Sequence, residues 1–120
     1  MPTVLALGLD PLVVGPKAMG GLSPAVVRAF IDAQLDRIRV LGYEVESCFV
    51  DRGETAEAVL TERLQERTFD CVLIGAGLRA PEHLLLFEKL LNRVHSLAPT
   101  AKICFNNTPA DSAEAVQRWV

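Results

Sequence analysis

Residues 71–83 read CVLIGAGLRAPEH, and this stretch indicates the class of fold. It starts as an apolar run of strand length, passes through Gly75-Ala76-Gly77, and reaches Pro81, a residue suited to the first turn of a helix. A continuous apolar run of this kind is typical of a strand covered on both faces of its sheet. The stretch therefore predicts a strand over residues 70–75, a short connection, and a helix over residues 81–97.

The same alternation of strand and helix patterns recurs along the chain. Short apolar or alternating runs predict strands, and runs with apolar residues every three or four positions predict helices. The expected strands cover residues 3–9, 43–50, 70–75 and 102–105. The expected helices cover residues 24–41, 54–68, 81–97 and 112–119. Such an order favours a parallel sheet with helices on both faces.

We therefore expect an α/β fold, a three-layer α/β/α sandwich of the flavodoxin-like class, whose four parallel strands take the order 2-1-3-4. In that order the topological switch lies between the first and third strands. Ligands of such folds bind there, at the carboxyl ends of the strands. Any site should then be built from the segments that follow Gly8, Val50, Gly75 and Phe105.

The composition is that of one small packed domain over residues 1–120. Half of the residues are hydrophobic and 22% are charged. A formal net charge of −3 gives no general attraction to nucleic acid or to an anionic membrane. Apolar runs stay well below the roughly 18 residues that span a bilayer, and the first residues do not form a signal-peptide pattern. We expect no nucleic acid and no membrane among the partners, and a cytoplasmic location.

Three cysteines, Cys48, Cys71 and Cys104, lie in or beside expected strands. They are odd in number, form no C-x-x-C motif, and have no histidine at metal-ligand spacing. Free cysteine is among the most buried residue types, so free thiols in the core are the favoured interpretation. The sequence predicts neither a metal nor a cofactor.

Four segments, taken in order, resemble a response-regulator receiver domain. They are VLALGLDP (4–11), LGYEVESCFVDRGETAEAVL (41–60), DCVLIGAGLRAPEHLLLFEKL (70–90) and LAPTAKICFNNTPADSAEAVQRW (97–119). The resemblance implies a flavodoxin-like fold. It also implies an acidic pair after the first strand that holds Mg²⁺, a phosphate-accepting aspartate ending the third strand, and a hydroxyl residue ending the fourth.

The chain departs from the receiver pattern at each of these positions. Asp10 is the one acid after the first strand, Gly75 replaces the phosphate acceptor, and Asn106 or Asn107 replaces the hydroxyl residue. Glycine has no carboxylate to phosphorylate, and one acid is a poor Mg²⁺ site. We therefore expect a non-phosphorylatable receiver-like module that works by binding a protein partner or by self-association.

The alternative is a small-molecule or anion-binding protein, or an enzyme, with its site at the carboxyl ends of the strands. Arg79 could add charge-assisted hydrogen bonds to a phosphate or carboxylate. Residues 75–80 satisfy G-x-G-x-x-G/A, but they follow the third strand, and no acid ends the next strand to hold a ribose. A glycine turn with positive φ and close helix approach is the other interpretation. The candidate residues are Gly8, Asp10, Lys17, Asp51, Gly75, Gly77, Arg79, Asn106 and Asn107.

Residues 10–23 form an unusually long connection with two prolines and three glycines, which argue against a regular element. Long loops in compact domains are commonly lids, binding loops or disordered segments. The position of this loop over the switch point favours a lid, and a flexible, inert loop or a loop that contacts a partner are the alternatives. Lys17 lies in this loop but does not complete a P-loop motif. Asp10, Asp51 and Asp111 follow strands and could converge as an acid cluster, although turns and helix caps attract aspartate for local reasons.

The strand over residues 102–105 should be an edge strand, because no fifth strand is predicted beside it. An apolar edge is a liability that proteins usually cover. We therefore expect a homodimer that forms through this side of the sheet.

Overall fold

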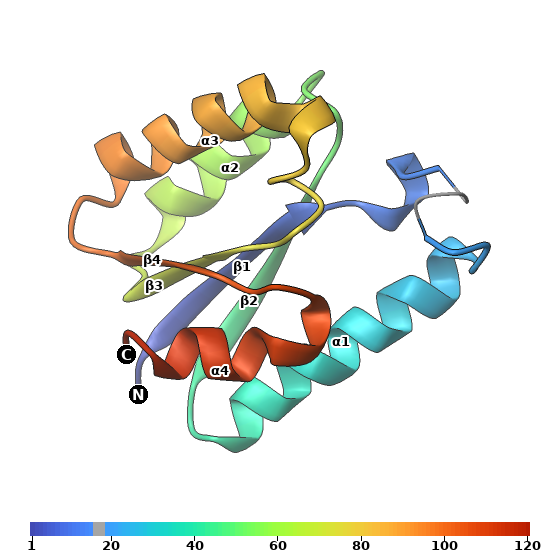
Figure 1. The fold of residues 1–120 in the computed structure, drawn as a ribbon. Coiled ribbons are helices and arrows are strands. Elements are labelled where there is room, and N and C mark those ends of the chain that lie inside the picture. The colour runs from blue at the N-terminus through green and yellow to red at the C-terminus, as the bar shows by residue number, and fades with distance from the viewer. Residues whose placement is uncertain (16–18) are drawn as a thin grey trace.

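Four parallel strands form a single sheet in the order β2-β1-β3-β4 (Figure 1). The computed structural model describes residues 1–15 and 19–120. The strands are β1 (Thr3–Leu9), β2 (Glu44–Val50), β3 (Cys71–Ile74) and β4 (Lys102–Phe105). The predicted strand order and the parallel direction are confirmed.

Two pairs of helices cover the two faces of this sheet (Figure 1). The helices α1 (Pro24–Val40) and α4 (Ser112–Gln117) lie on one face, and α2 (Ala56–Glu66) and α3 (Leu84–Leu97) lie on the other. The result is the predicted three-layer, flavodoxin-like sandwich. In the described ranges, no helix is long and apolar enough to cross a membrane.

Three short 3-10 turns were not predicted from the sequence. They are η1 (Pro11–Val13), η2 (Pro81–His83) and η3 (Pro109–Asp111). Each begins with proline, whose fixed φ suits the first position of a helical turn. The expectation of no regular element over residues 10–23 is wrong at η1, and η2 delays the start of α3 by three residues.

Local hydrogen bonds set where the long helices begin. Ser23 caps α1 by accepting a hydrogen bond from the Val26 N–H at 3.2 Å, as its position before Pro24 predicts. The second expected helix starts two residues late, at Ala56, because the Asp51 carboxylate accepts the N–H groups of Thr55 and Ala56. These residues therefore form the turn that precedes α2.

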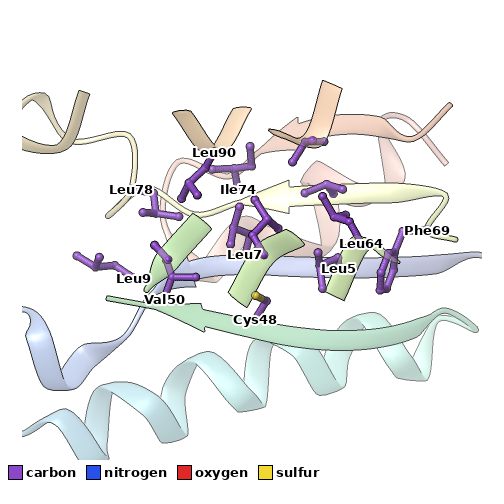
Figure 2. Close-up of a cluster of buried hydrophobic side chains, with 14 residues drawn as sticks. Leu5, Leu7, Leu9, Cys48, Val50, Leu64, Phe69, Ile74, Leu78 and Leu90 are labelled. Atoms are coloured by element: carbon purple, nitrogen blue, oxygen red, sulfur yellow. The ribbon is translucent and has the colours of Figure 1, made fainter. Parts of the chain in front are cut away.

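The larger core cluster lies between the sheet and the α2–α3 layer (Figure 2). Leu5, Leu7 and Leu9 of β1 point into it, because alternate residues of a strand face the same side. A second cluster under α1 and α4 contains Val4, together with Cys71 and Cys104. All three cysteines are free and buried, with Cys48 in the first cluster, so the prediction of core thiols is confirmed.

Two helices are less buried than their apolar periodicity predicts. In α3, Leu84 and Leu85 are 59% and 76% exposed, whereas Leu90 is buried. At about 100° per residue, both leucines lie more than about 110° around the helix from Leu90, so they miss the face on the sheet. In α1, Phe30 is 46% exposed, since the helix and the sheet are separated there by the cleft described next.

Candidate functional site

A cleft of about 530 Å³ opens at the carboxyl ends of the strands, on the face of the sheet covered by α1 and α4. This is the switch point between β1 and β3 at which ligands of such folds bind. The volume lies within the roughly 300–1,000 Å³ of typical small-molecule sites. The lining residues are Ala6, Leu7, Gly8, Leu9, Pro11, Val14, Met19, Leu22, Val26, Val27, Phe30, Ile31, Leu35, Phe49, Leu73, Gly75, Ala76, Gly77, Asn106, Pro109 and Ser112.

The floor of the cleft is one row of residues that runs across the sheet. Phe49 pairs with Gly8 in the β2–β1 register. Gly75 continues the β1–β3 ladder by donating its N–H to the Leu7 carbonyl at 2.9 Å. Asn106 directly follows the last residue of β4 and lies beside Gly75 in the extended register. The row therefore reads Phe49, Gly8, Gly75, Asn106. Its two central residues are glycines without a side chain, and they lie between an aromatic ring and an amide.

Side-chain size falls toward the carboxyl end of the central strand on this face. Val4, Ala6 and Gly8 alternate with the core leucines and so face α1. A Cβ placed on Gly8 would meet no atom within 4 Å. The cleft exists because the row that would fill it carries glycine at its two central positions.

The conformation of Gly75 and Gly77 differs from the turn considered from the sequence. Neither glycine has a positive φ. A Cβ on Gly75 would lie 3.6 Å from the Leu7 carbonyl oxygen, and one on Gly77 would lie 3.7 Å from Leu9 Cβ, both ordinary contacts. The predicted turn is present over residues 76–79. It does not depend on a positive φ or on a close helix approach at these two glycines, so that part of the interpretation is wrong. Glycine at position 75 leaves out a side chain that would otherwise stand in the cleft.

Apolar side chains from three segments form the walls. Val26 and Phe30 of α1 stand half-exposed on one side, and Met19 and Leu22 extend this side from the first loop. Phe49 forms the end of the row, and the guanidinium of Arg28 lies 3.9 Å from the centre of its ring. Such a wall favours a partner that buries apolar surface.

The polar part of the lining is confined to the β4 side. Asn106 and Ser112 are both buried. Asn106 Nδ2 donates to Ser112 Oγ at 3.0 Å, and this hydroxyl donates in turn to the Pro109 carbonyl at 2.7 Å. No charged side chain lines the cleft in the part of the chain that the structure describes.

Arg79 lies outside the cleft, behind Asn106. Its Nε donates to the Ile74 carbonyl at 3.2 Å, and its NH2 group donates to the carbonyl and to Oδ1 of Asn106. The guanidinium also lies 4.8 Å from the centre of the Phe105 ring. Burial lowers its pKa, and the nearby Asp111 carboxylate opposes this shift. These contacts engage Arg79 with the ends of β3 and β4 rather than with the cleft.

Asp10 and Asp51 serve as local caps. Asp10 Oδ1 accepts the Leu12 N–H at 2.9 Å and so starts η1. Asp51 accepts the hydroxyl of Thr55 at 2.6 Å and the backbone N–H groups of Gly53, Thr55 and Ala56. The Thr55 hydroxyl is the largest of the causes that lower the pKa of Asp51 to about 2.

Asp111 closes a capping box at the start of η3. Thr108 accepts the Ala110 N–H, while the Asp111 carboxylate accepts from the backbone of Thr108 and from both nitrogens of Asn107. Burial raises the pKa of Asp111, but these hydrogen bonds outweigh it and the net shift is downward. Among the described residues, no group of three or more metal-ligating side chains could hold a metal ion.

The structure thus brings together only part of the predicted set. Gly8, Gly75, Gly77 and Asn106 line the cleft, whereas Asp10, Asp51, Arg79 and Asn107 do not. Lys17 lies outside the described residues. The walls contributed by Val26, Phe30, Phe49 and Ser112 were not predicted. Finding them required the strand register, because their spacing in the sequence carries no site signal.

Comparison of the chain with protein-family models, with curated proteins and with solved structures finds no match.

Proposed function

We propose that this protein binds a small, largely apolar molecule in the cleft at the carboxyl ends of β1 and β3. The observation that carries the proposal is the glycine row, which leaves about 530 Å³ open between Phe49 and Asn106 in an apolar lining. An exposed apolar concavity of this size is costly to leave in water, so a ligand that fills it is stabilised by burial of the same surface.

Binding without catalysis is the form of the proposal that the lining supports best. General acid–base and nucleophilic chemistry need a positioned titratable or activated group within reach of the substrate. In the described lining, the one hydroxyl is that of Ser112, and it already donates to the Pro109 carbonyl. The three aspartates of this edge are engaged as caps.

A titration with Nile red, an uncharged apolar dye, tests this function. The wild-type protein should enhance and blue-shift the dye fluorescence with saturation at one site. Gly8→Val places a branched side chain on the floor of the cleft and should weaken this binding at least tenfold. Ser47→Val adds a side chain of the same type on β2, at a position outside the lining, and should leave binding unchanged. Equal binding by all three proteins would contradict the proposal.

A receiver-like regulatory module that self-associates is the second candidate. The edge position of β4 supports it, because Phe105 is 39% exposed there. Arg118 donates to the Phe105 carbonyl at 2.8 Å, which covers part of this edge. Light scattering at micromolar concentration should give the mass of a homodimer, and a monomer would contradict this candidate. Incubation with acetyl phosphate and Mg²⁺ should add no phosphoryl mass, since Gly75 stands where a receiver has its acceptor.

We place either function in the cytoplasm. Three free, buried thiols support this proposal, because reducing conditions keep cysteines unpaired. Fractionation of cells that produce the protein would test it, and recovery in an extracellular or membrane fraction would contradict it.

A further inference from the structure

We infer that the ligand of this cleft is an uncharged apolar molecule carrying a hydrogen-bond acceptor, such as a ketone, ester or amide carbonyl, and that Asn106 selects it. The inference rests on the proposed function and specifies its ligand class. Its basis is the set of charges, hydrogen-bond donors and hydrogen-bond acceptors in the described lining.

The described part of the lining presents no charged side chain to balance an ionised ligand head group. An ion moved into an apolar cleft loses its hydration and needs a partner of opposite charge. Two guanidinium groups lie next to lining residues, and both already have partners. Arg28 lies over the Phe49 ring and pairs with Asp32 at 3.6 Å. Arg79 donates to the carbonyl of Ile74 and to both oxygens of Asn106. Arg79 would have to leave these contacts and the Phe105 ring to reach a ligand. Within residues 1–15 and 19–120, a carboxylate or phosphate in this cleft therefore has no free counter-charge.

The orientation of the Asn106 side chain is fixed by its two neighbours. Arg79 carries only donors, so the oxygen of the amide must face it, at 3.2 Å. The nitrogen then faces Ser112 Oγ, at 3.0 Å. Because the Ser112 hydroxyl donates its one hydrogen to Pro109, it can only accept from Asn106. The second Nδ2 hydrogen of Asn106 therefore has no acceptor among the described residues and can be donated to a ligand.

The backbone beside Asn106 adds donors of the same kind. Ala76 and Gly77 line the cleft directly after β3, and no acceptor among the described residues takes their N–H groups. Neutral N–H donors on one side of an apolar cleft can bind a ligand group that only accepts hydrogen bonds. A carbonyl oxygen has two lone pairs and meets this requirement, whereas an ammonium group has only donors.

Four ten-carbon probes separate this inference from the general proposal: decane, 2-decanone, decanoate and decylamine, each measured by displacement of Nile red at pH 8. The ketone should bind at least tenfold more tightly than decanoate or decylamine. Asn106→Asp keeps the shape and an oxygen toward Arg79 but removes the amide donor. This variant should bind 2-decanone about tenfold more weakly and decane with unchanged affinity. The difference in affinity between 2-decanone and decylamine should become smaller.

A measurement on the wild-type protein covers the case in which Asn106→Asp fails to fold. In ¹⁵N-labelled protein, 2-decanone should shift the side-chain amide resonances of Asn106, and decane should shift them at most slightly. Tighter binding of decanoate than of the ketone, or an unmoved Asn106 amide with bound ketone, overturns the inference while leaving a ligand cleft in place. Failure of all four probes and of the dye to bind overturns the proposed function itself.

Discussion

Gly8 and Gly75 lie side by side at the carboxyl ends of β1 and β3, so that a Cβ on Gly75 would lie 3.9 Å from the Cα of Gly8. Neighbouring positions of a parallel sheet normally place two side chains against the covering helix. Here both positions are glycines without a side chain, and the N-terminal half of α1 faces the open cleft. The cleft is thus a consequence of two residues that meet only when the sheet forms.

Filling this space should stabilise the protein. Gly8→Val should raise the free energy of unfolding by about 1 kcal/mol, because a buried valine side chain contributes about 1.5–3 kcal/mol and replacement of glycine restricts the unfolded chain. Gly8 has no positive φ and no close neighbour that would oppose the new atoms. Urea unfolding at constant m value measures the change.

Ser47→Val is the matched control for that experiment. It adds apolar atoms on β2, on the same face of the sheet as Gly8, without filling the cleft. A loss of more than about 1 kcal/mol in Gly8→Val, beyond any loss in Ser47→Val, would mean that the position is closed. Strain of that size is typical of overpacked cores.

Arg79 should prove structural rather than anion-binding. Arg79→Ala leaves the carbonyls of Ile74 and Asn106 without their donor, and an unsatisfied buried polar group costs about 1–3 kcal/mol. Thermal unfolding should show this loss, while Lys89→Ala on the exposed side of α3 should be near neutral. Added phosphate should leave the melting temperature of the wild type and of Arg79→Ala unchanged. Stabilisation by phosphate that disappears in Arg79→Ala would restore the anion hypothesis.

Asp51 should make the stability of the fold depend on pH in the acid range. Hydrogen bonds, above all from the Thr55 hydroxyl, lower its pKa to about 2, so the unfolded state binds the proton more readily than the folded state. This stabilisation is complete above the ordinary aspartate pKa of about 4 and is lost as the pH falls to about 2. The difference in urea midpoint between wild type and Asp51→Ala should therefore be constant near neutral pH and shrink below pH 4.

Glu54→Gln provides the control, because it removes a carboxylate from the same turn. If the difference between wild type and Asp51→Ala stayed constant down to pH 2, the Asp51 carboxylate would not be the stabilising group.

The thiols should be inert while the protein is folded. Burial raises the pKa of Cys48 to about 11, and the hydrogen bond to Cys104 together with burial raises that of Cys71. The same hydrogen bond lowers the pKa of Cys104, but this thiol is buried and out of reach of a reagent. Only thiolates react rapidly, so Ellman's reagent at pH 8 should modify the native protein slowly and at a rate that follows unfolding. In guanidinium chloride three thiols should react at once. One fast thiol in the native protein would contradict the burial of the cysteines.

The fold could be predicted from the sequence because its signals are local. The apolar run over residues 3–9, the Ser23-Pro24 cap and the alternation of strand and helix patterns each lie within a few residues. Together they determine the strand order through the rules for parallel sheets. A proline-started 3-10 turn, η2, shifts the start of α3, since proline is suited to any first helical turn and does not distinguish the two kinds of helix.

The site could be predicted only in position. The carboxyl edge follows from the topology, but its chemistry depends on residues that the strand register brings together from four parts of the chain. Gly75 and Gly77 suggested a turn with positive φ, and Arg79 suggested an anion site. Sequence alone shows neither the φ of these glycines nor the carbonyl oxygens that Arg79 faces. Nothing in the sequence marks Phe30 and Phe49 as lining residues, because the tertiary structure decides their position.

The central claim is that an uncharged apolar molecule occupies the space above Gly8 and Gly75. Backbone ¹H–¹⁵N spectra of the wild-type protein during a titration with 2-decanone test it most directly. The account predicts saturable shifts at Gly8, Gly75 and Ala76, and no comparable shifts at residues on the α2–α3 face such as Leu60. Shifts that are absent, or that are distributed equally over both faces of the sheet, would contradict it.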